Sequence, residues 1–225
     1  MEFLIFAAKL KPNYMQIIDL SHEIHEQMTV FGDTEKPEIS RVFTVEKDGF
    51  QLHTLKINSH TGTHVDAPAH MISGRKYLDN FSLEQFIGKG FVLKVDQFAN
   101  AEIPLSFLKK YEEQIRETEF FILNSGWYKK WQTAEYQLKY PILSLESAKW
   151  LTQFNLKGIG LDVISIDPTD SQDVPLHKII LGANFLIIEN LTNLDVLPEA
   201  GFQFQCFPLR ISQADGSTSR VVAVV

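Results

Sequence analysis

The chain has one cysteine, no long apolar segment and fewer basic than acidic residues, and each of these shortages excludes a class of protein. Cys206 has no second thiol with which to form an internal disulfide, and its alternating apolar neighbours predict a buried structural residue. The apolar stretch that follows Met1 and Glu2 is too short to span a bilayer and lacks the basic start of a secretory signal. A cytoplasmic protein without a membrane partner is therefore expected.

The charge balance argues against a second class of protein. The chain carries 21 Lys and Arg against 28 Asp and Glu, which gives a net charge of -7. Binding to nucleic-acid phosphates needs clustered basic residues. We therefore expect no nucleic-acid partner.

Length and composition favour one core. The 225 residues are 44% hydrophobic, and the composition does not shift along the chain. We expect one domain over residues 15–225. Residues 1–14 are interpreted as an N-terminal extension or as a start placed too early, because Met15 offers a second start just before the segment that begins at Ile17.

The hydrophobic pattern predicts a mixed α/β protein in which strands outnumber helices. Two strands flank the turn signal Asp48-Gly49 and form a hairpin that leads into a histidine-rich segment. Ser82 begins a short helix that Gly88 ends. The other expected strands and helices are residues 91–95, 120–123, 158–162, 185–188, 202–209 and 221–225 for strands, with 40–45 and 51–57 in the hairpin, and residues 104–115 and 144–154 for helices.

The histidine-rich segment reads HTGTHVDAPAH over residues 60–70. Imidazole and carboxylate are the ligands that zinc and similar divalent ions prefer, and His60, His64 and Asp66 are close enough in sequence for one turn to gather them. Gly62 permits the tight backbone path that such a turn needs. His70 follows the rigid corner at Pro68, where a general acid or base would be placed.

A histidine pair with this spacing is a weak signal by itself, because most histidines lie on the surface or in the core. The glycine, aspartate, proline and third histidine inside the same short segment make the functional interpretation the stronger one. A catalytic metal site also leaves one coordination position open for water. The segment therefore predicts the metal-holding wall of a hydrolytic site.

The same segment resembles the HxGTHxDxPxH signature of the cyclase family of metal-dependent hydrolases, which includes the bacterial kynurenine formamidases. Further segments fit this family: Asp19-Leu20-Ser21 near the start, GLDVISID over residues 160–167, and His177 followed by Glu189. The resemblance runs from Ile17 to the end of the chain. It implies a strand-rich, swivelling β/β/α fold and a homo-oligomer, either a dimer or a tetramer.

The resemblance also implies the roles of individual residues. His60, His64 and Asp66 would hold one divalent ion, Asp66 would bridge to a second one held by His177 and Glu189, and His70 would be the catalytic acid and base. One or two ions per chain are compatible with this set, with zinc expected first and manganese second. Independently of the family, Pro175 predicts a helix start just before His177, and Glu189 closes an apolar strand, where an ordinary solvated carboxylate would also sit.

The expected substrate is a small aromatic amide. The resemblance favours the formyl amide of N-formylkynurenine or a related aryl formamide, and Phe31 and Trp127 are the aromatic residues expected to contact it. Core or interface packing is the alternative for both rings. Two other functions stay open: opening of a cyclic amide, as in isatin hydrolases, and a metal-binding protein without turnover. Asp162 and Asp167 are expected either to orient ligands or to cap turns.

Overall fold

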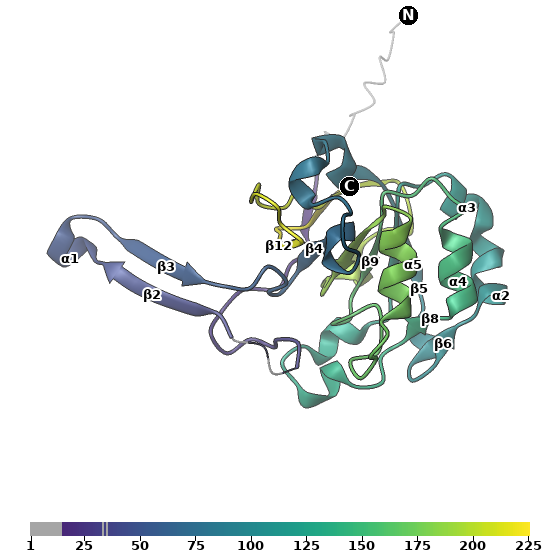
Figure 1. Ribbon diagram of the computed structural model, residues 1–225, viewed down its shortest axis with the longest axis horizontal. Helices are drawn as coiled ribbons and strands as arrows, with labels where there is room; N and C mark the ends of the chain where they lie inside the picture. The colour runs from purple at the N-terminus through teal and green to yellow at the C-terminus, as the bar shows by residue number, and fades with distance from the viewer. Residues whose placement is uncertain (1–14, 33, 35) are drawn as a thin grey trace, which may run out of the picture.

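The structure is a computed structural model that describes residues 15–32, 34 and 36–225 (Figure 1). The predicted N-terminal extension, residues 1–14, lies outside the described residues. Among the described helices, none is long and apolar enough to cross a membrane.

Nine strands of the described chain form one curled sheet that mixes parallel and antiparallel neighbours, so the predicted strand-rich mixed α/β class is confirmed. Four neighbouring strands run parallel at its centre, as expected where helices supply the crossovers. In order across the sheet, the strands are β1 (Ile17–Asp19), β13 (Val222–Val224), β11 (Phe202–Gln205), β5 (Ile87–Lys94), β7 (Phe120–Asn124), β9 (Gly158–Leu161), β10 (Leu186–Glu189), β4 (His64–Asp66) and β12 (Gly216–Thr218).

Each face of the sheet is covered by a separate hydrophobic cluster. One cluster joins the sheet to the helices and includes Phe121, Ile159 and Ile180. The other includes Val65, Phe120 and Phe204 and lies on the opposite side of the same strands. The helices on the first face are α2 (Leu105–Leu108), α3 (Glu112–Arg116), α4 (Leu145–Leu151) and α5 (Pro175–Gly182), which gather on the right in Figure 1. Packing on both faces therefore holds the strands, and the side chains at their ends, in fixed positions.

Two predicted helices differ from the structure. The segment 104–115 is broken into α2, a 3-10 turn and α3, because Tyr111 leaves helical geometry with φ -117° and ψ 19° while its ring packs against Phe91 and Phe107. The helix expected after Ser82 is only the 3-10 turn Leu83–Phe86. Gly88 lies inside β5 instead of ending that helix, and a Cβ there would approach the Glu119 carboxylate to 2.6 Å.

The helix expected from Ser144 is confirmed in α4, where the Ser144 hydroxyl accepts a hydrogen bond from the Ser147 amide. A two-stranded sheet of β6 (Glu102–Ile103) and β8 (Ile142–Leu143) lies before it.

The predicted hairpin is confirmed and stands away from the rest of the molecule at the left of Figure 1. It consists of β2 (Glu38–Phe43), the helical turn α1 (Val45–Asp48) and β3 (Leu52–Lys56), and we call residues 38–56 the arm. Gly49 closes the turn with φ +79°, a conformation that glycine adopts without a steric cost. No residue of the arm is buried.

Candidate metal centre

The predicted metal-binding segment folds into strand β4, one strand in from the edge of the sheet. His64 and Asp66 are two residues apart and therefore project from the same face of β4, while Val65 points to the other face. Both side chains are buried, with exposures of 3% and 0%. Gly62 has φ +65°, which confirms the tight path expected before this strand. Its carbonyl accepts a hydrogen bond from Nδ1 of His64 at 2.7 Å.

The neighbouring strands complete this arrangement. Strand β10 places Glu189 directly opposite His64, and its carboxylate lies 3.5 Å from Nε2 of His64. Strand β12 places Gly216 opposite Asp66. A Cβ at Gly216 would lie 2.4 Å from the ring of His60, so only glycine leaves room for that imidazole.

His177 reaches the same place from helix α5. Its ring and its backbone N–H both contact Oδ2 of Asp167, at 2.7 and 2.9 Å, and the Leu176 N–H donates to the other oxygen. The predicted helix start at Pro175 is confirmed. Asp167 therefore orients His177, which is one of the two roles expected for it. Nε2 of His177 is left facing Oε1 of Glu189 at 3.6 Å.

Asp66 lies at the centre of this cluster. Nδ1 of His60 and Nε2 of His64 lie 2.7 and 3.2 Å from Oδ1, and Nε2 of His177 lies 3.8 Å from Oδ2. Yet among the described residues neither oxygen has a hydrogen-bond partner of acceptable geometry. The three imidazole nitrogens therefore lie close to Asp66 without forming hydrogen bonds to it.

These convergent atoms fit one or two divalent cations. A buried carboxylate without hydrogen bonds is costly unless a positive charge faces it. The second nitrogens of all three imidazoles contact acceptors: Gly62 for His64, Asp167 for His177, and Asp215 for His60 at 3.0 Å. Metal-binding histidines commonly have such a second partner, which fixes the ring and the tautomer. His60, His64 and Asp66 also form a group whose ligand atoms lie within 4.8 Å of one another.

The pKa values in the cluster are shifted by burial, by its two buried carboxylates and by the imidazoles around them. Burial raises the pKa of Glu189 well above its ordinary range, and the neighbouring Asp66 carboxylate raises it further. Burial by itself would lower the pKa of His60, but Asp66 and Asp215 outweigh it and raise the value to about 9. His60 and His64 hold the pKa of Asp66 well below its usual range despite complete burial. A protonated His60 therefore stabilises the Asp66 carboxylate, as a cation would.

His70 lies beside the cluster in a 3-10 turn, Pro68–His70. Its ring centroid is 3.9 Å from that of His60 and 5.9 Å from that of His177. Nδ1 of His70 lies 3.3 Å from Oδ2 of Asp215, the oxygen that also contacts His60. Burial, assisted by the charges of His60 and His177, lowers the pKa of His70. The imidazole is therefore neutral near pH 7 and can accept a proton.

A cavity of about 740 Å³ opens onto this cluster. The rings of His60, His64, His70 and His177 and the carboxylate of Glu189 line it. Phe31, Val30 and Met71 supply an apolar part of the wall, and Phe31 is 44% exposed. The cavity can therefore receive a small molecule with an apolar portion.

The structure places two other expected residues away from this cavity. Trp127 is 5% exposed in the core, its indole N–H donates to the Tyr136 carbonyl, and it is not among the described residues that line the cavity. Its ring is used for packing, which was the alternative left open for it. Asp162 accepts hydrogen bonds from Ser125 and from the Trp127 amide. Asp162 therefore supports the turn after β7 and contacts no predicted ligand.

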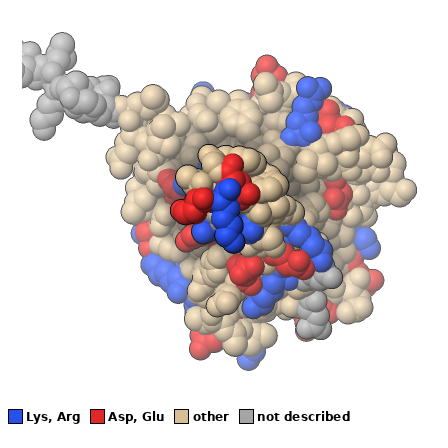
Figure 2. Space-filling view, turned by 90° about the vertical axis from the view of Figure 1, so that its left-hand side faces the viewer, with Lys and Arg blue, Asp and Glu red and all other residues tan. Residues whose placement is uncertain are grey.

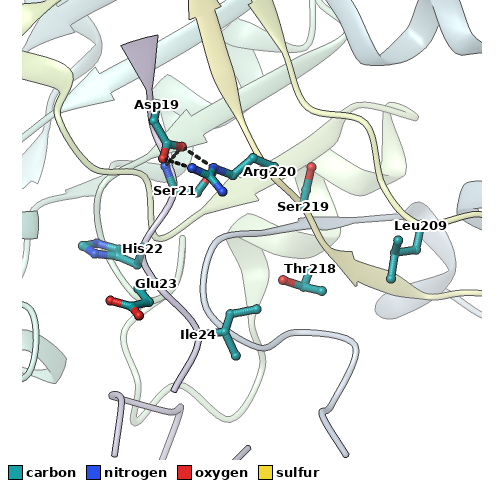
Figure 3. Close-up of a pocket in the computed structure, with 9 residues that line it drawn as sticks. All are labelled: Asp19, Ser21, His22, Glu23, Ile24, Leu209, Thr218, Ser219 and Arg220. Atoms are coloured by element: carbon teal, nitrogen blue, oxygen red, sulfur yellow. Dashed lines mark hydrogen bonds and ion pairs between the residues drawn. The ribbon is translucent and has the colours of Figure 1, made fainter. Parts of the chain in front are cut away.

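A second cavity, of about 660 Å³ (Figure 3), shares no lining residue with the first. Its lining includes the ion pair of Asp19 and Arg220, with two contacts of 2.8 and 2.6 Å, and it includes none of the predicted metal ligands. Ser21 accepts from the Val221 amide and donates to the Val221 carbonyl. The Asp19-Leu20-Ser21 segment thus ties strand β1 to the end of the chain.

Asp215 and Gly216 are the residues of the centre that the sequence did not reveal. Asp215 is 155 positions from His60 and Gly216 follows it, and an Asp-Gly pair is typical of ordinary turns. The Asp-Gly turn could have pointed to Asp215 and Gly216, because turns at strand ends often carry functional side chains.

A curled mixed sheet with imidazoles and carboxylates converging on an inner strand defines a metal-dependent enzyme of the α/β class. The profile of the Cyclase family, described as "Putative cyclase", matches residues 18–168. The chain belongs to this family of metal-dependent hydrolases.

Individual relatives are distant but extend over most of the chain. A kynurenine formamidase of Bacillus thuringiensis (strain Al Hakam) is 27% identical over 208 residues, which cover 91% of this chain and 95% of the relative. Cyclase-like protein 2 of Oryza sativa subsp. japonica is 24% identical over 93% of this chain and 79% of the relative.

Among solved structures, an isatin hydrolase bound to the product analogue thioisatinate superposes with a TM-score of 0.86 at 21% identity, covering 94% of this chain and 92% of that one. Isatin hydrolase A from Labrenzia aggregata, bound to benzyl benzoate, has the same TM-score at 24% identity, with 94% of each chain covered. At these identities the likeness confirms the fold.

Proposed function

We propose that this chain hydrolyses the formyl amide of an aromatic amine, with N-formylkynurenine as the first candidate, and releases the free amine and formate. The observation that carries the proposal is Asp66, whose two buried oxygens lack hydrogen-bond partners among the described residues while imidazoles approach from both sides. The kynurenine formamidase relative, at 27% identity over 91% of this chain, supports the choice of substrate.

The ligand set proposed for the cation is His60, His64 and Asp66, extended by His177 and Glu189 if two ions bind. Zinc is the first candidate and manganese the second, since nitrogen and carboxylate donors suit both. Such an ion, when bound, activates water near neutral pH and polarises the carbonyl of an amide. The protein contributes the geometry, because the second nitrogen of each imidazole is already fixed by an acceptor.

His70 is proposed as the proton carrier. Partial burial raises the pKa of Asp215, but hydrogen bonds from His60 and His70 outweigh this and lower it, so Asp215 is ionised at neutral pH. An ionised Asp215 holds the proton of His70 on Nδ1 and leaves the other ring nitrogen basic. That nitrogen accepts a proton from the attacking water and returns it to the amine nitrogen as the carbon–nitrogen bond breaks.

The proposed substrate has an aromatic ring next to its amide, and the cavity can accommodate both parts. The polar end would lie against the imidazoles, and the ring would lie against Phe31 and Val30. The apolar wall is partly open, since Phe31 is 44% exposed. Phe31 is therefore proposed as a substrate contact.

The test is a substrate panel combined with His70→Ala. Purified protein reconstituted with zinc or manganese would be assayed on N-formylkynurenine, a simple aryl formamide and isatin, and its metal content measured. We expect formamide hydrolysis by the parent, and a 10²–10⁴-fold lower kcat in His70→Ala with metal content unchanged, the usual range for loss of a general acid–base.

Each other outcome has a definite meaning. Turnover of isatin alone would replace the formamidase proposal with ring opening by the same residues. Metal binding without turnover of any substrate would favour a metal-binding protein. A His70→Ala variant as active as the parent would show that another group carries the proton.

A further inference from the structure

One wall of the metal cavity is a short segment, residues 29–32, in which no residue is buried. Thr29, Val30 and Phe31 of this wall segment line the cavity, and Phe31 is 44% exposed. The arm follows it in the chain but offers no buried contact, since no residue of the arm is buried. In Figure 2 the arm projects toward the viewer, with charged side chains at its tip. Hydrogen bonds from the body must therefore fix the wall segment.

The side-chain amide of Gln137 makes two such bonds, one on each side of Phe31. Its Nε2 donates to the Val30 carbonyl at 3.0 Å, and its Oε1 accepts from the Gly32 N–H at 3.1 Å. The reverse orientation of the amide would bring two acceptors together at Val30 and two donors together at Gly32, so both bonds require this one. Gln137 thus holds the backbone that carries the Phe31 ring.

The backbone after Phe31 has little preference of its own. Gly32 has φ +51°, and glycine adopts positive and negative φ with similar ease. A segment with few buried contacts opens at low cost unless hydrogen bonds oppose it. The two bonds from Gln137 supply this restraint. The Gln132 N–H adds a third bond by donating to the Thr29 hydroxyl oxygen at 3.1 Å.

The turn that carries Gln137 is itself anchored in the core. It is the 3-10 turn Ala134–Gln137, and Tyr136 within it is 0% exposed. The Tyr136 hydroxyl donates to Oδ1 of Asn190 at 2.9 Å, and its carbonyl accepts from the Trp127 indole N–H at 3.0 Å. Gln137 is therefore a fixed point against which the wall segment is held.

Gln137 also holds a second part of the cavity wall. The Thr169 hydroxyl donates to the Gln137 carbonyl at 3.0 Å, and Thr169 lines the metal cavity together with Pro168. Gln137 is not among the described residues that line this cavity. It lines instead a third cavity, of about 780 Å³, which shares Pro168 and Thr169 with the metal cavity. Gln137 therefore acts on a molecule in the metal cavity through the residues that it holds.

We propose that Gln137 is the positioning residue of the aromatic end of the substrate site. By holding Val30 and Gly32, it fixes the Phe31 ring where the ring of a substrate would pack, and it thereby favours amides that carry an aromatic ring. Such preorganisation increases affinity, because binding no longer has to order the wall. This role rests on the proposed function for the kind of substrate, and it adds the residue that selects for the ring.

Two substitutions separate the hydrogen bonds of Gln137 from its bulk. Gln137→Met keeps the length of the side chain and removes both bonds. Gln137→Glu keeps an acceptor for the Gly32 N–H but places a second acceptor against the Val30 carbonyl, so it should lose one bond. Gln153→Met is the matched control, because Gln153 is an exposed glutamine that lines none of the three cavities.

Binding is measured without hydrolysis, by NMR titration of the purified full chain with acetanilide, an aryl amide, and with N-methylacetamide, which has no ring. We expect the parent to bind acetanilide more tightly. Gln137→Met should raise the Kd for acetanilide about 5-fold, the cost of ordering one more side chain on binding, and should leave that for N-methylacetamide unchanged. Gln137→Glu should lie between these two proteins, and Gln153→Met should match the parent.

Turnover is measured separately on metal-loaded protein. The KM for an aryl formamide should rise by the same factor in Gln137→Met, with kcat little changed because His70 and the metal ligands are not altered. A parent without preference for the ring, or a Gln137→Met variant that binds both amides as the parent does or loses both equally, would overturn the role of Gln137 and leave the hydrolysis proposal intact. Ring binding that depends on Gln137 in a parent that hydrolyses no formamide would refute the proposed function alone.

Discussion

The metal centre and the arm place side chains in unfavourable surroundings in opposite ways: the centre buries ionisable side chains, and the arm exposes apolar ones. The centre buries ionisable side chains, with Asp66 at 0% exposure, and compensates them with fixed imidazoles. The arm leaves apolar side chains exposed, with Phe43 and Phe50 in contact with each other but none of its residues buried. The difference teaches that the centre meets the cost of burial with neighbouring groups of the same chain, whereas the arm leaves its apolar side chains in contact with solvent.

The largest expected effect separates the two regions. Asp66→Asn removes a charge that three imidazoles approach, so metal binding should be lost and hydrolysis should fall by about 10³-fold or more, because the cation supplies several kcal/mol of stabilisation. Metal content and kcat would be measured together, with Asp48→Asn on the arm as control. Full metal content in the Asp66→Asn variant would show that the ion lies elsewhere.

The next effect concerns stability of the metal-free protein. Folded His60 holds its proton more tightly than the unfolded chain does, because Asp66 and Asp215 outweigh the cost of burial and raise its pKa from 6.5 to about 9. Its stabilisation is therefore complete below about pH 6.5 and lost as the pH rises through about 9. The shift corresponds to at most about 3 kcal/mol, part of which is the same interaction that lowers the pKa of Asp66.

Chemical denaturation of metal-stripped protein between pH 6 and pH 10 checks this expectation. The parent should lose stability over that range relative to His60→Gln. The matched variant His53→Gln changes an exposed histidine of the arm and should follow the parent within about 0.5 kcal/mol. Parallel curves for the parent and His60→Gln would contradict the ion pair with Asp66.

A smaller effect is expected at Asp215, which touches His60 and His70 with one oxygen. Asp215→Asn should lower kcat by about 10–100-fold, the usual loss for a residue that orients a ligand, and should move the acidic limb of the kcat profile because the tautomer of His70 is no longer fixed. KM should change little. Asp215→Glu, which keeps the carboxylate, should recover part of the rate.

Asp19→Asn provides the control for that change. Asp19 pairs with Arg220 on the second cavity, so its loss removes a carboxylate without touching the metal centre. If Asp19→Asn altered the pH profile in the same way, the change seen in Asp215→Asn would reflect a general loss of stability. Asp215 would then not be the residue that positions His70.

The sequence could predict the part of the centre that is local. His60, His64 and Asp66 lie in one short segment, and their types and spacing indicated a metal site before any fold was known. His177 and Glu189 could be assigned only through the family resemblance, because strand pairing brings Glu189 to His64 from a distance along the chain. Asp215 was missed for the same reason.

The fold shows the same division between local and distant information. Long strands such as β5 and β7 carry a readable pattern, while β4 and β12 have three residues each, too few for periodicity to act on. The arm was predicted as a hairpin, but its exposure was not. Alternating apolar residues indicate a strand with one covered face, whereas no residue of the arm is buried.

The smallest effect lies where the two regions meet, at Phe31. This ring lines the metal cavity and lies close in sequence to the start of the arm. If the ring contacts the substrate, Phe31→Ala should raise KM about 10-fold, equivalent to the loss of about 1.4 kcal/mol of apolar burial, with kcat changed less than about 3-fold. Leu83→Ala, an exposed side chain outside both regions, should change neither. An unaltered KM in Phe31→Ala would remove the ring from the substrate site. A KM that rises equally in Leu52→Asp would instead indicate that the arm holds this wall in place, because Leu52 itself does not line the cavity.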